Sequence, residues 1–438
     1  MKTKFSVRKH LSITSMLEAT HNAFSKIPEH TKRTSCLSLT DCLMSGLALF
    51  GLKYPSLLQF DKDARKSPIQ HNLKSLYKIS QVPSDTYMRE RLDKVEPRYL
   101  QKALDKIINQ LQRGKVLEQY QYMEEKYYLV PIDGSGYFSS HEIHCASCCE
   151  KHHRDGGITY YHQMLAAVMV RPGYRSVFPL AIEPIQKEDG ASKNDCEHNA
   201  ASRLLKNLRS QHPHLNMVLV LDALYADGPT LKLIKELGFH FIVTAKSNDL
   251  KYLFEAYQAS EKKEIIEGRD GEVRHYNFAN DLPLNDKHSD FKVNVLECFE
   301  EIKGDKHYFC WATDLPLTES KLVQIAKGGR ARWKIENETF NTLKNQGYQF
   351  EHNFGHGYEH LSTVLAYLMF LAFLIDQVQE FCCKYFKAAL AQCTGRRHLW
   401  QKLQGLFFTF LISSWPGLFE ALVRHDWAPS LEGSLDSS

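Results

Sequence analysis

The sequence lacks both a long apolar run and a disulfide framework. Its longest apolar stretch, 361–375, has fifteen residues and is interrupted by Ser362 and Thr363. A helix that spans a bilayer needs roughly 20 apolar residues, so we expect a buried core helix here and no membrane partner. The start, Met1–Ser6, has no apolar core of a secretory signal. The eleven cysteines are odd in number and scattered, which favours a reduced cytosol.

Charged residues of both signs are common, but they are unevenly distributed along the chain. The net charge is +4, yet residues 1–115 hold 21 Lys and Arg against 10 Asp and Glu. The remainder therefore holds 34 basic against 41 acidic residues. A basic amino-terminal part beside an acidic remainder suggests phosphate contact by the first and metal binding by the second. The alternative is an ordinary solvated basic surface.

The basic part is predicted to be helical over 1–117. Ser38 and its neighbours offer caps before an apolar helix at 42–50, Pro83–Thr86 caps a charged helix, and Pro97 begins another through about Arg113. Such a module suits DNA binding, although no helix-turn-helix signature identifies a recognition helix.

One apolar run, 218–221, leads directly into Asp222. Four consecutive apolar residues predict a strand buried on both faces. A buried strand seldom ends in a carboxylate without a partner, because an unpaired charge is costly to desolvate. The segment 128–136 has the same design, with a short apolar strand that is expected to end at Asp133. Both aspartates are therefore expected at strand ends, where ligand sites of α/β sheets form.

A third acid follows in the segment 332–344. It contains no Gly or Pro, and Ile335, Phe340 and Leu343 have helical spacing, so it predicts a continuous helix that carries Glu336. Two aspartates and a glutamate make a cluster of oxygen ligands, which suits Mg²⁺ or Mn²⁺ rather than zinc.

The order of Asp133, Asp222 and an Arg-Trp-x-Ile-Glu segment with a following lysine resembles the DDE transposases of bacterial insertion sequences. The resemblance covers about 120–365, and its most specific strings are 222–229 and 333–337. It implies an α/β fold, an RNase H-like mixed sheet flanked by helices, with a β-rich insertion and helical ends. The implied regions are a basic helical DNA-binding region and a core split by the insertion, followed by helices: 1–117, 118–249, 250–318, 319–378 and 379–438.

Within the core we expect strands at 160–170, 177–182 and 241–246 and helices at 199–211 and 229–237. A polar tail at 433–438 is expected to be disordered.

The resemblance also implies a function. Transposases of this kind bind the terminal inverted repeats of their element, cleave DNA to free 3′ hydroxyls and join these to target DNA. Asp133, Asp222 and Glu336 would be the catalytic metal ligands, with Asp133 bridging two Mg²⁺ or Mn²⁺ ions. Pairing of two ends implies at least a homodimer, in bacterial cytoplasm near the nucleoid. The alternatives are a metal-dependent nuclease on the same core and a non-catalytic DNA-binding relic.

The third acid departs from the family pattern Y-x2-R-x3-E-x6-K in two ways. Residue 329 is Gly where Tyr is expected, and Lys344 follows Glu336 after seven residues instead of six. Glu338 is thus a rival, although Ile-Glu soon after Arg-Trp favours Glu336. The residues expected to contact DNA are Arg332, Lys344, Lys246 and Trp333; the alternative for the cations is ordinary surface charge.

A second constellation lies at 145–153, where Cys145, Cys148 and His152 could form part of a zinc site. The alternative is a cysteine-rich loop without metal. Three further histidines, at 352, 356 and 360, surround glycines at 355 and 357 that would break a helix. We therefore interpret these histidines as loop residues that approach DNA.

Overall fold

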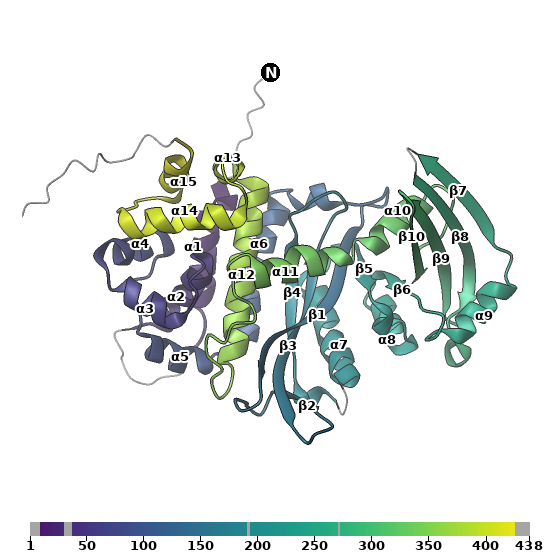
Figure 1. Ribbon diagram of the computed structural model, residues 1–438, viewed down its shortest axis with the longest axis horizontal. Helices are drawn as coiled ribbons and strands as arrows, with labels where there is room; N and C mark the ends of the chain where they lie inside the picture. The colour runs from purple at the N-terminus through teal and green to yellow at the C-terminus, as the bar shows by residue number, and fades with distance from the viewer. Residues whose placement is uncertain (1–8, 30–36, 191–192, 270–271, 425–438) are drawn as a thin grey trace, which may run out of the picture. The chain divides into compact units, whose positions relative to one another are not determined.

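The computed structural model describes residues 9–29, 37–190, 193–269 and 272–424 (Figure 1). The start Met1–Ser6 and the predicted tail 433–438 lie outside this range. The chain forms two compact units. We call the first the helical unit, Met1–Gln110 with Leu343–Phe350 and His360–Ser438, and the second the sheet unit, Leu111–Thr342 with Glu351–Glu359.

The helical unit combines the two ends of the chain, which the sequence predicted as separate regions. Ser38 Oγ accepts a hydrogen bond from Asp41 N (3.0 Å) and Ser84 Oγ accepts one from Tyr87 N (3.3 Å), so the predicted caps begin their helices. The main helices are α1 (Ile13–Phe24), α2 (Leu39–Gly51), α3 (Leu57–Ala64), α4 (Ser67–Tyr77), α5 (Asp85–Asp93), α6 (Arg98–Arg113), α12 (Leu361–Cys382), α13 (Lys384–Ala391), α14 (Arg396–Thr409) and α15 (Trp415–Arg424).

The predicted core helix, α12, is longer than its apolar stretch. At 22 residues it is long and apolar enough to cross a membrane by length and composition, but 94% of that apolar window is buried inside the protein. It packs against α2 and α5. Its buried Asp376 accepts from Lys53 Nζ (2.6 Å) and from the Tyr348 hydroxyl (2.5 Å). This internal pairing satisfies a charge that hydrocarbon would penalise, so α12 is the core of the helical unit.

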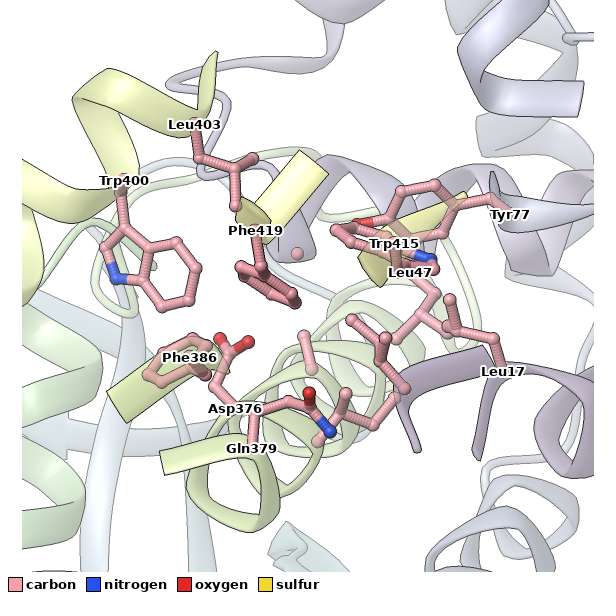
Figure 2. A pocket seen from close by; sticks show the side chains of 14 residues that line it. Leu17, Leu47, Tyr77, Asp376, Gln379, Phe386, Trp400, Leu403, Trp415 and Phe419 are labelled. Atoms are coloured by element: carbon pink, nitrogen blue, oxygen red, sulfur yellow. The ribbon is translucent and has the colours of Figure 1, made fainter. Parts of the chain in front are cut away.

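A small cavity lies beside Asp376 in the helical unit (Figure 2). The rings of Phe386, Trp400 and Phe419 line it together with the amide of Gln379. Among the described residues, both polar atoms of the Gln379 side chain have no hydrogen-bond partner. The cavity volume of about 20 Å³ holds roughly one water molecule. It therefore fits a buried water rather than a ligand.

The sheet unit is built on one mixed sheet in which the described residues form ten strands. The order is β2-β3-β1-β5-β6-β10-β9-β8-β7, with β4 paired to β3. Strand β3 runs antiparallel to both β1 and β4, whereas β1, β5 and β6 run parallel to one another. Helices α7 (Lys193–Gln211) and α8 (Gly228–Glu236) connect β4 to β5 and β5 to β6. The strands are β1 (Tyr128–Ser140), β2 (Cys149–His152), β3 (Ile158–Met169), β4 (Phe178–Ile185), β5 (Met217–Leu221), β6 (His240–Thr244), β7 (Lys263–Arg269), β8 (Glu272–Pro283), β9 (Lys292–Ile302) and β10 (Asp305–Thr313).

This β-β-β-α-β-α-β order is the predicted RNase H-like core. The remaining elements of the unit, with the short helix that leads out of it, are η2 (Leu117–Tyr120), η3 (Lys187–Asp189), η4 (Ala223–Tyr225), α9 (Lys251–Ala259), η5 (Asp286–His288), α10 (Leu322–Arg330), η6 (Ile335–Phe340) and α11 (Asn341–Asn345).

The β-rich segment between Asp222 and Glu336 extends this same sheet. Strand β10 pairs antiparallel with β6, with Trp311 opposite Thr244, and β9, β8 and β7 follow outward (Figure 1). Backbone hydrogen bonds thus join the insertion to the catalytic core of the family. Because β6 has a partner on both sides, its free edge is removed.

The prediction that β1 ends at Asp133 is wrong. The parallel pairing with β5 ends at Pro131 opposite Val220, but β1 continues to Ser140 as the partner of β3. Glycines at 134 and 136 do not end the strand, because β3 still supplies backbone hydrogen bonds there. Asp133 therefore lies inside β1, just beyond the point where its neighbour β5 stops.

Candidate active site

Asp133 and Asp222 come from neighbouring parallel strands. Pro131 is opposite Val220, and each aspartate lies two residues further along its chain, Asp133 within β1 and Asp222 directly after β5. Strands in a sheet are about 4.8 Å apart, so equal register brings the two carboxylates to the same level. The Asp222 carboxylate accepts a hydrogen bond from Leu224 N (2.9 Å), and that of Asp133 accepts one from Gly134 N (2.9 Å). Local backbone donors thus hold both side chains in place.

Glu336 reaches the same place from η6, which packs against β1. Burial raises the pKa of the Asp133 carboxyl above its ordinary value, and the charges of Asp222 and Glu336 raise it further. The Arg332 guanidinium, 3.2 Å from Asp133, opposes this rise. Like-charged neighbours shift a pKa appreciably only at short range. Asp222 and Glu336 therefore both act on the Asp133 carboxyl.

The segment that carries Glu336 is not a continuous α-helix as predicted. It is a π-helix over Ile335–Phe340 followed by α11, and Asn341 N donates to the carbonyl of Glu336 five residues earlier. A π-turn accommodates one residue more than an α-turn and is frequent at functional sites. The eight-residue step from Glu336 to Lys344 across this turn therefore corresponds to the seven-residue step of the family pattern along an α-helix.

The other departure from the family pattern, Gly329, has a steric reason. A Cβ on Gly329 would lie 2.5 Å from the indole of Trp311, a buried residue of β10. Helix α10 therefore packs on the insertion at a distance that only glycine permits. A tyrosine at this position would displace the helix that leads into Glu336.

A cleft of about 1050 Å³ opens beside Asp222 in the sheet unit. Three of the residues predicted to contact DNA line it, namely Lys246, Arg332 and Trp333. Lys246 and Trp333 are exposed, and the Arg332 guanidinium lies 4.8 Å from the centroid of the Trp333 ring. The fourth, Lys344, is half-buried in the part of α11 that belongs to the helical unit. The rival acid Glu338 is half-buried within the π-helix.

The insertion adds residues to this cleft that the sequence did not indicate. Tyr308 and Phe309 of β10 line it opposite the core strands, and Tyr308 is 51% exposed. Close to Asp222 and Asp133, the Tyr225 hydroxyl donates a hydrogen bond to Glu197 of α7 (2.9 Å). Burial raises the pKa of Tyr225 well above its ordinary value. The adjacent aromatic residues Tyr308 and Phe309, with Trp311 after them, were the available signal for this part of β10. Tyr225 and Glu197 meet only through the packing of α7.

The structure brings two of the three predicted zinc ligands together but not the third. Cys145 and Cys148 lie together, but His152 does not join them, because it is on the short strand β2 with its ring 3.3 Å from Glu150 and its side chain 69% exposed. Two distant histidines take its place. They are His162 of β3 and His356, which the sequence had assigned to a DNA-approaching loop.

Comparison with known proteins identifies the family. A family model described as a transposase DDE domain matches residues 150–375, just over half of the chain. The matched range begins after Asp133 and includes Asp222 and Glu336. No curated protein matches the chain. The mixed sheet, the three converging acids and this match agree, and the chain belongs to the family of transposases with a DDE domain.

Proposed function

We propose that this chain is an active transposase, which cleaves DNA at the terminal inverted repeats of an insertion sequence and joins the freed 3′ ends to target DNA. The observation that carries the proposal is that the charges of Asp222 and Glu336 both act on the buried Asp133 carboxyl, and that Asp222 lines an open cleft. Structural acids are usually paired with cations, whereas here three acids share one arginine-lined site. Such clustering is typical of functional sites.

The donor set fits divalent metal. All three side chains offer carboxylate oxygens, the ligands that Mg²⁺ and Mn²⁺ prefer. The raised pKa of Asp133 means that the metal-free site holds its negative charges at a cost, which a bound cation would relieve. A pair of such ions would activate the attacking water or 3′ hydroxyl and stabilise the leaving oxygen.

The remaining residues of the site would contact the phosphates and bases of the DNA. Arg332 pairs with Asp133 in the metal-free protein, and a metal-bound carboxylate would free this guanidinium for a phosphate. Lys246 offers a second cation at the cleft, and Trp333, Tyr308 and Phe309 offer aromatic faces on which bases can stack. Joining two element ends in one event further implies a homodimer on double-stranded DNA.

The test is a strand-transfer assay with the full-length protein and labelled DNA that carries the flanking terminal repeats. Joined products should form with Mg²⁺ or Mn²⁺ and disappear in Asp133→Asn and Asp222→Asn, while DNA binding survives. Asp249→Asn, an exposed acid of the same cleft, should retain activity and serves as the matched control. Hydrolysis without joining would favour the nuclease, and DNA binding without any cleavage would favour the relic.

A further inference from the structure

We propose that Cys145, Cys148, His162 and His356 bind one zinc ion in a closed tetrahedral site of the sheet unit. One ligand atom from each of these residues lies within 4.8 Å of all the others. This site is separate from the three acids in both position and chemistry. Thiolate and imidazole are soft or intermediate ligands, and four of them in this combination select zinc.

Five of the six distances between the ligand atoms are close to those of a zinc tetrahedron, and the sixth, from Cys145 Sγ to a ring nitrogen of His356, is within 4.8 Å. With Zn–S near 2.3 Å and Zn–N near 2.0–2.1 Å, two sulphurs lie about 3.8 Å apart, sulphur and nitrogen about 3.6 Å and two nitrogens about 3.3 Å. The two Sγ atoms are 3.8 Å apart, and the two Nε2 atoms are 3.1 Å apart. The sulphur–nitrogen distances are 3.6 Å from Cys145 to His162, 3.3 Å from Cys148 to His162 and 3.3 Å from Cys148 to His356.

The protonation state of His356 is already suited to a metal. Its Nδ1 lies 2.9 Å from the carbonyl oxygen of Gly357, which can only accept a hydrogen bond. Nδ1 must therefore carry the proton, and in the neutral ring Nε2 presents a lone pair to the cluster. Metal-binding histidines are oriented in the same way by a carbonyl or carboxylate on the far nitrogen.

The two cysteines are held by a tight turn. Cys148 N donates to the carbonyl of Cys145 (3.2 Å), and Cys145 N points at Cys148 Sγ (3.4 Å). Such a turn places both sulphurs on one side, and the backbone N–H helps to stabilise a thiolate. The sulphurs are too far apart for a disulfide, whose S–S bond is about 2.05 Å. The turn therefore favours joint binding of one ion over a covalent bond.

The site is enclosed by protein. Cys148, His162 and His356 are each more than nine-tenths buried, and Cys145 is half-buried. A β-bulge in β1 places Tyr137 between the paired positions 136 and 138, so that the rings of Tyr137 and Phe138 both lie close to His162, with centroids 5.7 and 5.8 Å away. Four protein ligands and an aromatic wall leave no open position for substrate. The site is therefore structural rather than catalytic.

The four ligands come from three segments, of which the one with His356 is 208 residues from Cys148 in the sequence. Cys145 and Cys148 lie between β1 and β2, His162 lies on β3, and His356 lies in the short return of the chain to the sheet unit, Glu351–Glu359. That return contains no helix or strand. The zinc ion would thus fasten this segment, which follows the Glu336 helix, to the core sheet.

The test is the metal content of the full-length protein purified without chelators. Elemental analysis should give one zinc per chain, and cobalt added to zinc-free protein should show the visible bands of tetrahedral coordination and a thiolate charge-transfer band. Cys148→Ser and His356→Asn should abolish stoichiometric zinc. The matched controls Cys149→Ser and His152→Asn change the same residue types outside the cluster and should keep it, as should Asp133→Asn.

Three results would overturn the proposal. They are a folded wild-type protein that neither contains zinc nor takes up zinc or cobalt, zinc that persists in Cys148→Ser, and a Cys145–Cys148 disulfide found by thiol titration. The cobalt spectrum needs no variant, so the test stands even where a substitution prevents folding. None of these measurements depends on transposition, so failure of the proposed function would leave this test unaffected.

Discussion

The sheet unit carries two clusters of side chains that we propose bind metal, and their designs are opposite. Asp133, Asp222 and Glu336 offer carboxylate oxygens and are partly exposed, Asp222 lines a wide cleft, and the charges of the other two acids raise the pKa of Asp133. The Cys–His cluster has sulphur and nitrogen ligands, largely buried, with one histidine already oriented. Strand β1 serves both, since Asp133 and Phe138 are five residues, or roughly 16 Å, apart along it. An open site of hard ligands suits chemistry on a substrate, and a closed site of soft ligands suits stability.

If the acid cluster is catalytic and the Cys–His cluster is structural, substitution of the aspartates should have the largest effect on activity. Asp133→Asn and Asp222→Asn should each lower strand transfer by about a thousandfold or more, on the scale of losing a catalytic group. Zinc content and the thermal midpoint should stay close to those of the wild type. A variant that lost both activity and zinc would erase the distinction between the two clusters.

The glutamates of the π-helix give the next test. Glu336→Gln should reduce cleavage on the same scale as the aspartate variants, because Glu336 acts on the charge of Asp133. Glu338→Gln, in the same turn, should leave cleavage within a few-fold of the wild type. Single-turnover cleavage under identical Mn²⁺ concentrations measures both. The opposite ranking would transfer the third ligand to Glu338.

The Cys–His cluster should affect stability instead. Cys148→Ser removes a ligand and should lower the free energy of unfolding by more than about 4 kcal/mol, a size associated with loss of a structural metal. Cys149→Ser, also buried, should cost about 1 kcal/mol. Denaturant unfolding followed by circular dichroism measures both. Equal losses would mean that the cluster holds no metal of structural importance.

Gly329 precedes the segment that carries Glu336, so its close packing against Trp311 should affect the position of that acid. Gly329→Ala places a methyl group against the Trp311 indole and should destabilise the protein by about 1–3 kcal/mol. Gly329→Tyr, which restores the family residue, should cost more and reduce cleavage. Gly405→Ala in α14 meets open space and should stabilise slightly, by about 0.5–1 kcal/mol. Thermal unfolding of the three variants in one buffer makes the comparison.

The smallest expected effect is a pH dependence of the metal-free protein. The folded-state pKa of Asp133 is raised, so the folded protein binds this proton more tightly than the unfolded chain. The contribution of Asp133 to stability is therefore full at low pH and is lost as pH rises through the raised pKa. Asp133→Asn should remove this loss and be slightly more stable near neutral pH. Saturating Mg²⁺ should stabilise the wild type alone and so reverse the order.

Several features of the fold could be predicted from local pattern. The apolar run before Asp222 determines β5, because four such residues find burial only inside a sheet. Ser38 and Ser84 determine where α2 and α5 begin, because a side-chain oxygen satisfies backbone groups within four residues. The order of the three acids in the sequence identified the family. The first two signals are local, and tertiary contacts did not change them.

Other features depend on contacts that no local pattern contains. The length of β1 beyond Asp133 follows from the extent of its partner β3, and the glycine at 329 follows from the indole of Trp311. His162 and His356 are 194 residues apart in the sequence, yet their Nε2 atoms are 3.1 Å apart.

The sequence by itself therefore determined β5, the starts of α2 and α5, and the order of acids that is typical of the family. The tertiary structure alone decided which histidines accompany Cys145 and Cys148, how the insertion joins the sheet and why Gly329 replaces tyrosine. The physical reason is that propensity and capping act over a few residues of chain, whereas ligand geometry and close packing depend on distances in space.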